Sequence, residues 1–436
     1  MTEKNHDPGD SPGHDDPATT APRRRSRWFR GWRPVAVAVV VAALAGGWVF
    51  SGTRIGQSGS ARAEAVVTAL ELATGDAQTN TAPTNTAPVD AAFQRDLDAL
   101  VKIDGFPGVE AFVRNADGKV RSYTAGVGNV TTKAPVPVDG QVRIASNTKT
   151  FTATTVLQLV GEGKIKLDDS VDTYLPGVLR GRGIDGTKIT IRQLLQQTSG
   201  LPDYDGALAG KSLVAVQHTY FEPRQALDSA LTKPAEFAPG AKWAYSNTNY
   251  LLAGLIVQRV TGRPIGEEIT TRVIEPAGLK HTYWPNTGVQ SIQGPHARSY
   301  FIEAPGASPV DVTELDPSLG WAAGQLISTP SDLSTFNRAL LEGKLLKTAQ
   351  QRELLTTVAS PGFEPENGWS YGLGFAKRRL TCGVDAWGHG GDITGFETRN
   401  LTTTDGRSAV IAVTALPTGV KGLEHVNAAI QDFICR

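Results

Sequence analysis

The sequence predicts an α+β fold: an antiparallel β-sheet flanked by helices, with a mostly helical subdomain inserted around residues 165 to 330. Segments with strand character occur near both ends of a body covering residues 91–436, and segments with helical spacing fill its middle. This order favours a sheet that is completed by distant parts of the chain. With 436 residues, of which 40% are hydrophobic, the chain can bury a sizeable core.

The first 90 residues are expected to lie outside this body. Residues 1–33 are polar and end in a cluster of arginines, which indicates a disordered cytoplasmic tail. The apolar run 34–50 is either the hydrophobic region of a cleaved secretory signal or an uncleaved membrane anchor; a buried soluble helix is the third interpretation. Residues 51–90 contain a repeated Thr-Asn-Thr-Ala-Pro and suggest a flexible linker. The body is therefore expected outside the cytoplasm, membrane-anchored or secreted.

Apolar spacing and turn residues predict the elements of the body in order. A helix is expected at 91–103, then two strands at 109–114 and 119–125 joined by the turn Asn115–Gly118, then a helix at 148–162. Other helices are expected at 191–197, 248–261, 266–273, 330–342 and 423–433, and a buried strand at 408–415.

The chain has two cysteines, Cys382 and Cys435. An even number in an exported chain suggests a disulfide that ties the C-terminal segment to the body. Two unpaired core thiols are the alternative.

Ser146-Asn-Thr-Lys149 is the first candidate for catalysis. Residues three apart share a helix face, so the Lys149 amine can reach the Ser146 hydroxyl and act as its base. A serine at a helix N-terminus also gains a backbone N–H for a developing oxyanion. Taken alone, the pattern is better explained by an N-cap serine followed by an exposed lysine.

Two further motifs bear chemically useful groups. In Tyr245-Ser-Asn247, a tyrosine whose phenolate is stabilised by a nearby ammonium can shuttle protons, and Asn247 can bind a substrate amide. In His389-Gly-Gly391, Gly390 and Gly391 permit a substrate to approach a strand closely, and His389 adds a titratable group.

In this order the three motifs resemble those of the serine β-lactamase and D,D-peptidase superfamily, and their Tyr and His forms resemble the class C and D-alanyl-D-alanine carboxypeptidase branch. The resemblance, which covers roughly residues 91–436, implies an acyl-enzyme on Ser146. Lys149 and Tyr245 would manage its proton, assisted by His389, and Asn247 would hold the substrate amide. The backbone N–H groups of Ser146 and Asp392 would form the oxyanion hole.

One departure from this branch concerns the substrate. The carboxypeptidases of this branch that the chain most resembles have threonines at the positions of Gly390 and Asp392, and an arginine for the substrate carboxylate at the position of Ala376. Asp392 should repel a carboxylate unless Lys377, Arg378 or Arg379 reaches it, and it could favour an amine-bearing substrate.

The expected function is that of a D-alanyl-D-alanine carboxypeptidase-like enzyme that acts on peptidoglycan-type peptides and recognises β-lactams. An esterase, a D-amino-acid amidase or aminopeptidase, and a β-lactamase are alternatives within the fold. A slow-acylating β-lactam sensor or wall-binding module is the alternative of another class. Scattered histidines indicate no metal and no cofactor is implied, while a net charge of zero gives no case for nucleic acid.

Overall fold

The computed structural model describes residues 83–204 and 214–436. The predicted cytoplasmic tail, the signal or anchor segment and all but the end of the linker lie outside these ranges. Contacts divide the chain at residues 75 and 76, and only the second unit, Asp76–Arg436, contains described residues. Within the two described ranges, no helix combines the length and apolarity that a membrane crossing requires.

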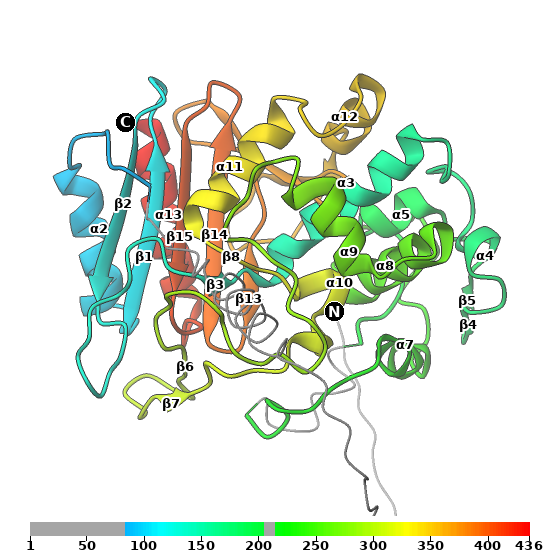
Figure 1. Cartoon of the computed structure of the whole chain (residues 1–436). Helices are drawn as coiled ribbons and strands as arrows, with labels where there is room; N and C mark the ends of the chain where they lie inside the picture. The colour runs from blue at the N-terminus through cyan, green and yellow to red at the C-terminus, as the bar shows by residue number, and fades with distance from the viewer. Residues whose placement is uncertain (1–82, 205–213) are drawn as a thin grey trace, which may run out of the picture. The chain divides into compact units, whose positions relative to one another are not determined.

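A large antiparallel sheet forms one part of this unit (Figure 1). Its strand order is β2-β1-β15-β14-β12-β11-β10-β9, and β13 pairs with β14. The strands are β1 (Gly108–Arg114), β2 (Val120–Gly126), β9 (Val358–Ala359), β10 (Trp369–Tyr371), β11 (Ala376–Arg379), β12 (Asp385–Gly388), β13 (Gly391–Ile393), β14 (Phe396–Thr403) and β15 (Ser408–Val413). The N-terminal hairpin thus pairs with the C-terminal strand β15, as the sequence predicts.

Helices cover the sheet and form the inserted part. They are α2 (Ala91–Lys102), α3 (Thr148–Gly161), α4 (Val171–Tyr174), α5 (Ile191–Leu195), α7 (Pro223–Leu231), α8 (Asn247–Thr261), α9 (Ile265–Ile269), α10 (Trp321–Gly324), α11 (Pro330–Leu341), α12 (Thr348–Leu355) and α13 (Val420–Cys435). The short helical turns are η1 (Ala145–Asn147), η2 (Thr270–Ile274) and η3 (Pro317–Leu319). Three two-stranded ribbons pair β3 (Val142–Arg143) with β8 (Ile327–Ser328), β4 (Arg180–Gly181) with β5 (Ile184–Asp185), and β6 (Tyr300–Phe301) with β7 (Val310–Asp311).

Two apolar clusters follow from the alternation of strand side chains. On β15, Ile411 packs in a cluster with residues of α2 and α13, whereas Val410 and Ala412 belong to a cluster with residues of α3, α8 and α11. Successive strand residues point to opposite faces, so β15 is apolar at nearly every position because both faces are covered. The α+β prediction is confirmed.

Helix α3 crosses the second cluster and is buried on all sides from Thr148 to Leu157. A helix that is buried on all sides shows no amphipathic pattern, because it has no face exposed to solvent. Its buried threonines find backbone acceptors: Thr150 donates to the carbonyl of Gly374 at 2.7 Å, and Thr152 donates to that of Ala322 at 2.7 Å. These bonds fix α3 against both the sheet side and the inserted helices.

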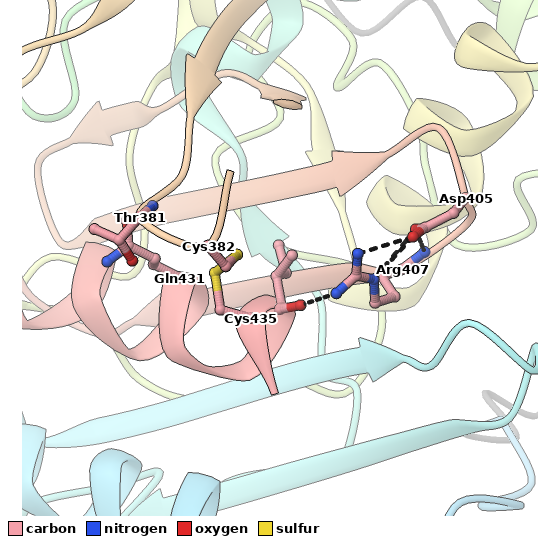
Figure 2. Close-up of a disulfide and its surroundings, with 7 residues drawn as sticks. Thr381, Cys382, Asp405, Arg407, Gln431 and Cys435 are labelled. Carbon is pink, nitrogen blue, oxygen red and sulfur yellow. Dashed lines mark hydrogen bonds and ion pairs between the residues drawn. A yellow bond between two sulfur atoms is a disulfide. The ribbon is translucent and has the colours of Figure 1, made fainter. Parts of the chain in front are cut away.

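Cys382 and Cys435 are joined in a disulfide in the structure (Figure 2). The bond links the turn between β11 and β12 to the end of α13. The chain between the two cysteines contains β12, β13, β14 and β15, so these four strands are part of the covalent ring that the disulfide closes.

Candidate active site

Ser146 is the middle residue of the turn η1, two residues before Thr148, the first residue of α3. The residue before it, Ala145, has a φ of 44°, in the left-handed region that costs a non-glycine residue about 1 kcal/mol or more. The backbone on either side is fixed, because Ile144 donates to the carbonyl of Leu326 at 3.1 Å and α3 is buried. The strained turn therefore holds the Ser146 hydroxyl at the start of a rigid helix.

Lys149 lies one turn further along α3 and is fully buried. Its Nζ lies 2.9 Å from Ser146 Oγ, 2.6 Å from Asn247 Oδ1 and 2.9 Å from the carbonyl oxygen of Ala323. A buried amine held by oxygen atoms from three segments has little freedom to move. The structure thus brings the predicted nucleophile and its predicted base into direct contact.

Asn247 begins α8 and connects Lys149 to an acid that the sequence analysis missed. Its side-chain amide donates to Asp203 Oδ2 at 3.1 Å, and its backbone N–H donates to the same oxygen at 2.8 Å. Asp203 thereby fixes which way the Asn247 amide points, leaving Oδ1 to accept from Lys149. In this structure Asn247 orients the lysine, beside its predicted role in substrate binding. Asp203 stands in a loop and no sequence pattern marks it.

Tyr245 places its ring beside both groups, with Lys149 Nζ 4.8 Å from the ring centroid. Burial raises the pKa of Tyr245 well above its usual range, and a hydrogen bond with Ser146 only partly opposes that rise. The hydroxyl is therefore a phenol near neutral pH, not the phenolate that the sequence analysis considered. The protonated Tyr245 hydroxyl, close to Ser146, is suited to donating a proton.

His389 lies next to the Tyr245 ring, at a centroid distance of 6.2 Å, but its nitrogens bond elsewhere. Nδ1 lies 2.5 Å from the Gly390 carbonyl oxygen, which only accepts, so Nδ1 carries the proton of the neutral ring. Nε2 then accepts from the Tyr371 hydroxyl at 2.9 Å. Burial, and after it the charge of Lys149, lowers the pKa of His389 to about 3. His389 is thus a neutral packing and hydrogen-bonding group near pH 7.

The low pKa of His389 predicts an acid-sensitive fold. Between pH 6.5 and 3 the unfolded chain binds a proton at this residue and the folded chain does not. The free energy of unfolding therefore falls as the pH falls, by about 1.4 kcal/mol per pH unit in that window. We expect His389→Gln to flatten the decline of Tm between pH 6.5 and 4.5. His425→Gln, on the surface, serves as the control, and equal slopes in wild type and His389→Gln would contradict the assignment.

Gly390 and Gly391 are required by contacts within the protein. A Cβ at Gly391 would lie 2.2 Å from the Ile144 carbonyl oxygen, and a Cβ at Gly390 would lie 2.5 Å from Glu364 Oε1. The first contact sets β13 directly against the segment that carries Ser146. The two predicted oxyanion donors, the N–H groups of Ser146 and Asp392, belong to these adjoining segments.

The side chain of Asp392 is bound by Arg399, a cation that the sequence analysis did not consider. Both carboxylate oxygens accept from its guanidinium, at 2.9 and 3.1 Å. The candidate cations on β11 pair elsewhere: Lys377 and Arg379 lie near Asp385, at 3.6 and 3.1 Å, and Arg378 lies 3.8 Å from Glu366. Arg399 stands on β14, whose polar sequence Phe-Glu-Thr-Arg-Asn-Leu-Thr-Thr shows no apolar strand pattern, although all eight residues are buried.

A serine hydroxyl bonded to a buried lysine, with a tyrosine and an asparagine beside them on this α+β fold, defines a serine hydrolase. Residues 93–433 match the family described as Beta-lactamase, and the chain belongs to that family. Its relatives include penicillin-binding proteins and D-amino acid amidases.

Two solved structures resemble the chain over nearly their whole length. A D-stereospecific amidohydrolase from Streptomyces sp. is 40% identical, with a TM-score of 0.72, over 78% of this chain and 98% of that one. A D-amino acid amidase from Ochrobactrum anthropi SV3, complexed with L-phenylalanine, is 26% identical, with a TM-score of 0.71, over 79% of this chain and 98% of that one.

Curated relatives are matched over part of their length. Penicillin-binding protein 4* of Bacillus subtilis (strain 168) is 26% identical over 302 residues, which make up 66% of this chain and 64% of the relative. Protein flp of Staphylococcus aureus (strain MW2) is 28% identical over 290 residues, 63% of this chain and 55% of the relative. The chain thus spans less than two thirds of the length of both relatives.

Proposed function

We propose that the protein hydrolyses amides of D-amino acids through an acyl-enzyme on Ser146. The observation that carries the proposal is the contact of 2.9 Å between Lys149 Nζ and Ser146 Oγ. The choice of amides of D-amino acids is supported by the 40% identity to a D-stereospecific amidohydrolase across 98% of that chain.

The geometry supports a division of roles in acyl transfer. Ser146 Oγ attacks the amide carbon while Lys149, as the neutral amine, takes the hydroxyl proton. The C–N bond then breaks, and the Tyr245 phenol donates a proton to the leaving amine. The Lys149 ammonium, beside the Tyr245 ring, returns the proton to Tyr245, and water later cleaves the ester by the reverse sequence. Asn247 and the Ala323 carbonyl keep Lys149 aimed at Ser146 throughout.

A D-alanyl-D-alanine carboxypeptidase-like peptidase that recognises β-lactams is the second candidate. The curated relatives named as penicillin-binding proteins favour it. Such an enzyme must bind a free substrate carboxylate, and here the buried Ala376 offers no cation while Arg399 is already bound to Asp392. This site therefore suits an uncharged amide better than a C-terminal carboxylate.

The test is hydrolysis of D-phenylalanine amide by the full chain, measured as ammonia release beside L-phenylalanine amide. We expect turnover of the D form at least about a hundredfold faster than the L form. Release of D-alanine from a D-alanyl-D-alanine peptide without amide turnover would establish the carboxypeptidase instead. Turnover only of an ester or of a chromogenic cephalosporin would establish an esterase or β-lactamase. A stable penicillin adduct without any turnover would establish a sensor.

We also propose that the catalytic body works outside the cytoplasm, either anchored or secreted. Support comes from the arginine cluster before the apolar run 34–50 and from the disulfide between Cys382 and Cys435. Fractionation of cells that make the full chain, with N-terminal sequencing of the product, tests both the location and the cleavage.

A further inference from the structure

A group of charged side chains borders the candidate site on the β13–β14 side of the sheet. Asp392 and Glu397 stand opposite each other in the β13–β14 pairing, and Arg399 follows two residues later on β14. Glu364 joins them, with Oε2 3.3 Å from the Arg399 guanidinium. The group contains three carboxyls and one guanidinium, and it lies directly beside Gly390 of the third motif.

Arg399 holds the Asp392 carboxylate in place from the protein interior. The arginine side chain is 5% exposed and the Asp392 side chain is 55% exposed, so the carboxylate is gripped on its buried side and open to solvent on the other. A bidentate pair of this kind fixes the plane of the carboxylate as well as its position. Burial works against the charge on Arg399, but the carboxyls around it, Asp392 first, raise the pKa of its guanidinium, so it stays protonated.

The group contains more carboxyl groups than guanidinium groups. Glu397 is 1% exposed, and neither of its carboxylate oxygens has a hydrogen-bond partner among residues 83–204 and 214–436. Burial raises its pKa to about 8, so it is largely protonated at neutral pH. Burial also raises the pKa of Glu364, which the charge of Arg399 opposes. The open, solvent-facing side of the Asp392 carboxylate therefore remains attractive to positive charge.

The negative charge of the Asp392 carboxylate affects the catalytic groups. Burial is the main cause of the raised pKa of the Tyr245 phenol, and the carboxylate of Asp392 adds to it. Asp392 also carries one of the two predicted oxyanion donors on its backbone. The α-nitrogen of an amino acid amide is two bonds from the carbonyl carbon, so a carbonyl held by that N–H would place this nitrogen near the residue that also carries the carboxylate.

We propose that the carboxylate of Asp392, anchored by Arg399, is the specificity-determining group that recognises the free α-ammonium of the substrate. The inference rests on the proposed amide hydrolysis and narrows it to substrates whose acyl residue has an unmodified amino group. N-acylated amides lose this attraction because their nitrogen is neutral, and substrates with a carboxylate at this point are repelled.

The experiment compares D-phenylalanine amide with N-acetyl-D-phenylalanine amide in wild type, Asp392→Asn and Asp392→Glu. We expect wild type to prefer the free amine, and Asp392→Asn to lower the ratio of the two kcat/KM values by about 10- to 100-fold, the range for loss of a charged hydrogen bond. Asp392→Glu should keep most of the preference. Asp385→Asn, which removes a surface acid on β12, should leave the ratio unchanged.

A ratio of the two kcat/KM values that is unchanged in Asp392→Asn overturns the inference. If both values fall by the same factor, the role of Asp392 is merely structural. A second probe separates this failure from failure of amide hydrolysis. The boronic acid analogues of D-phenylalanine, with a free and with an acetylated amine, bind a serine nucleophile without turnover. A preference for the free amine that Asp392→Asn removes supports the inference even if no amide is hydrolysed, and equal affinities in wild type overturn it.

Discussion

Alanine at position 146 is expected to remove the acyl-enzyme and to lower kcat for an amide substrate by about 10⁴-fold or more. The hydroxyl of Ser146 lies 2.9 Å from Nζ of Lys149, the proposed base, and the same amine lies 4.8 Å from the ring centroid of Tyr245, the proposed acid. With Ser146 absent, Lys149 and Tyr245 have no oxygen between them to activate. Intact mass after brief exposure to benzylpenicillin, together with ammonia release from D-phenylalanine amide, measures both consequences. Residual activity above about one per cent of wild type would mean that another group is the nucleophile.

A matched control separates this effect from general damage. Ser229 lies on α7, outside the candidate site, and Ser229→Ala is expected to retain full activity. Ser146→Ala itself should fold normally, because Lys149 keeps its contacts with Asn247 and Ala323. Thermal unfolding of the three proteins checks that point.

Replacing Lys149 by methionine is expected to lower kcat/KM by about 10³-fold while leaving the fold intact. Methionine has nearly the length and volume of lysine, so the buried space around Lys149 stays filled. What disappears is the amine that contacts Ser146 Oγ. The acceptors Asn247 Oδ1 and the Ala323 carbonyl lose a donor, and the cost is limited because no charge is left buried.

The control for this variant is Lys377→Met, a lysine on β11 that lies near Asp385. It should match wild type in activity. If Lys149→Met kept activity within tenfold of wild type, the proton of Ser146 would have to go elsewhere, and Tyr245 would become the candidate base. Measuring kcat/KM from pH 6 to 10 for wild type and Lys149→Met then shows whether a titration belongs to the lysine.

Sequence patterns predicted the parts of this fold that are locally encoded. The start of α2 at Ala91 and of α3 at Thr148 follows from apolar spacing, and Gly118, with a φ of 82°, marks the β1–β2 turn. The contact between Ser146 and Lys149 follows in the same way, because residues three apart at a helix start face the same side.

The parts that sequence patterns missed depend on contacts between distant segments. Strand β14 is buried along its whole length although only Phe396 and Leu401 are apolar, and contacts with distant segments hold several of its polar side chains. Asn400 donates to Asn147 at 2.6 Å and to the carbonyl of His389 at 2.8 Å. Arg399 could not be matched to Asp392 from sequence, since only the strand pairing shows that the two share a face. The neutral state of His389 likewise depends on burial among residues far away in the chain.

The covalent ring closed by Cys382 and Cys435 contains His389, Asp392 and Arg399, whereas Ser146, Lys149, Tyr245 and Asn247 lie outside it. Each half of the candidate site therefore belongs to a different stretch of polypeptide, and neither stretch contains a complete site. Beside the candidate site, the two stretches meet where Gly391 fits closely against the Ile144 carbonyl and where Asn400 donates to Asn147. During gradual denaturation, separation of the two halves at these contacts would abolish turnover while helices and strands persist. Enzymatic activity would thus serve as a more sensitive reporter of partial unfolding than circular dichroism.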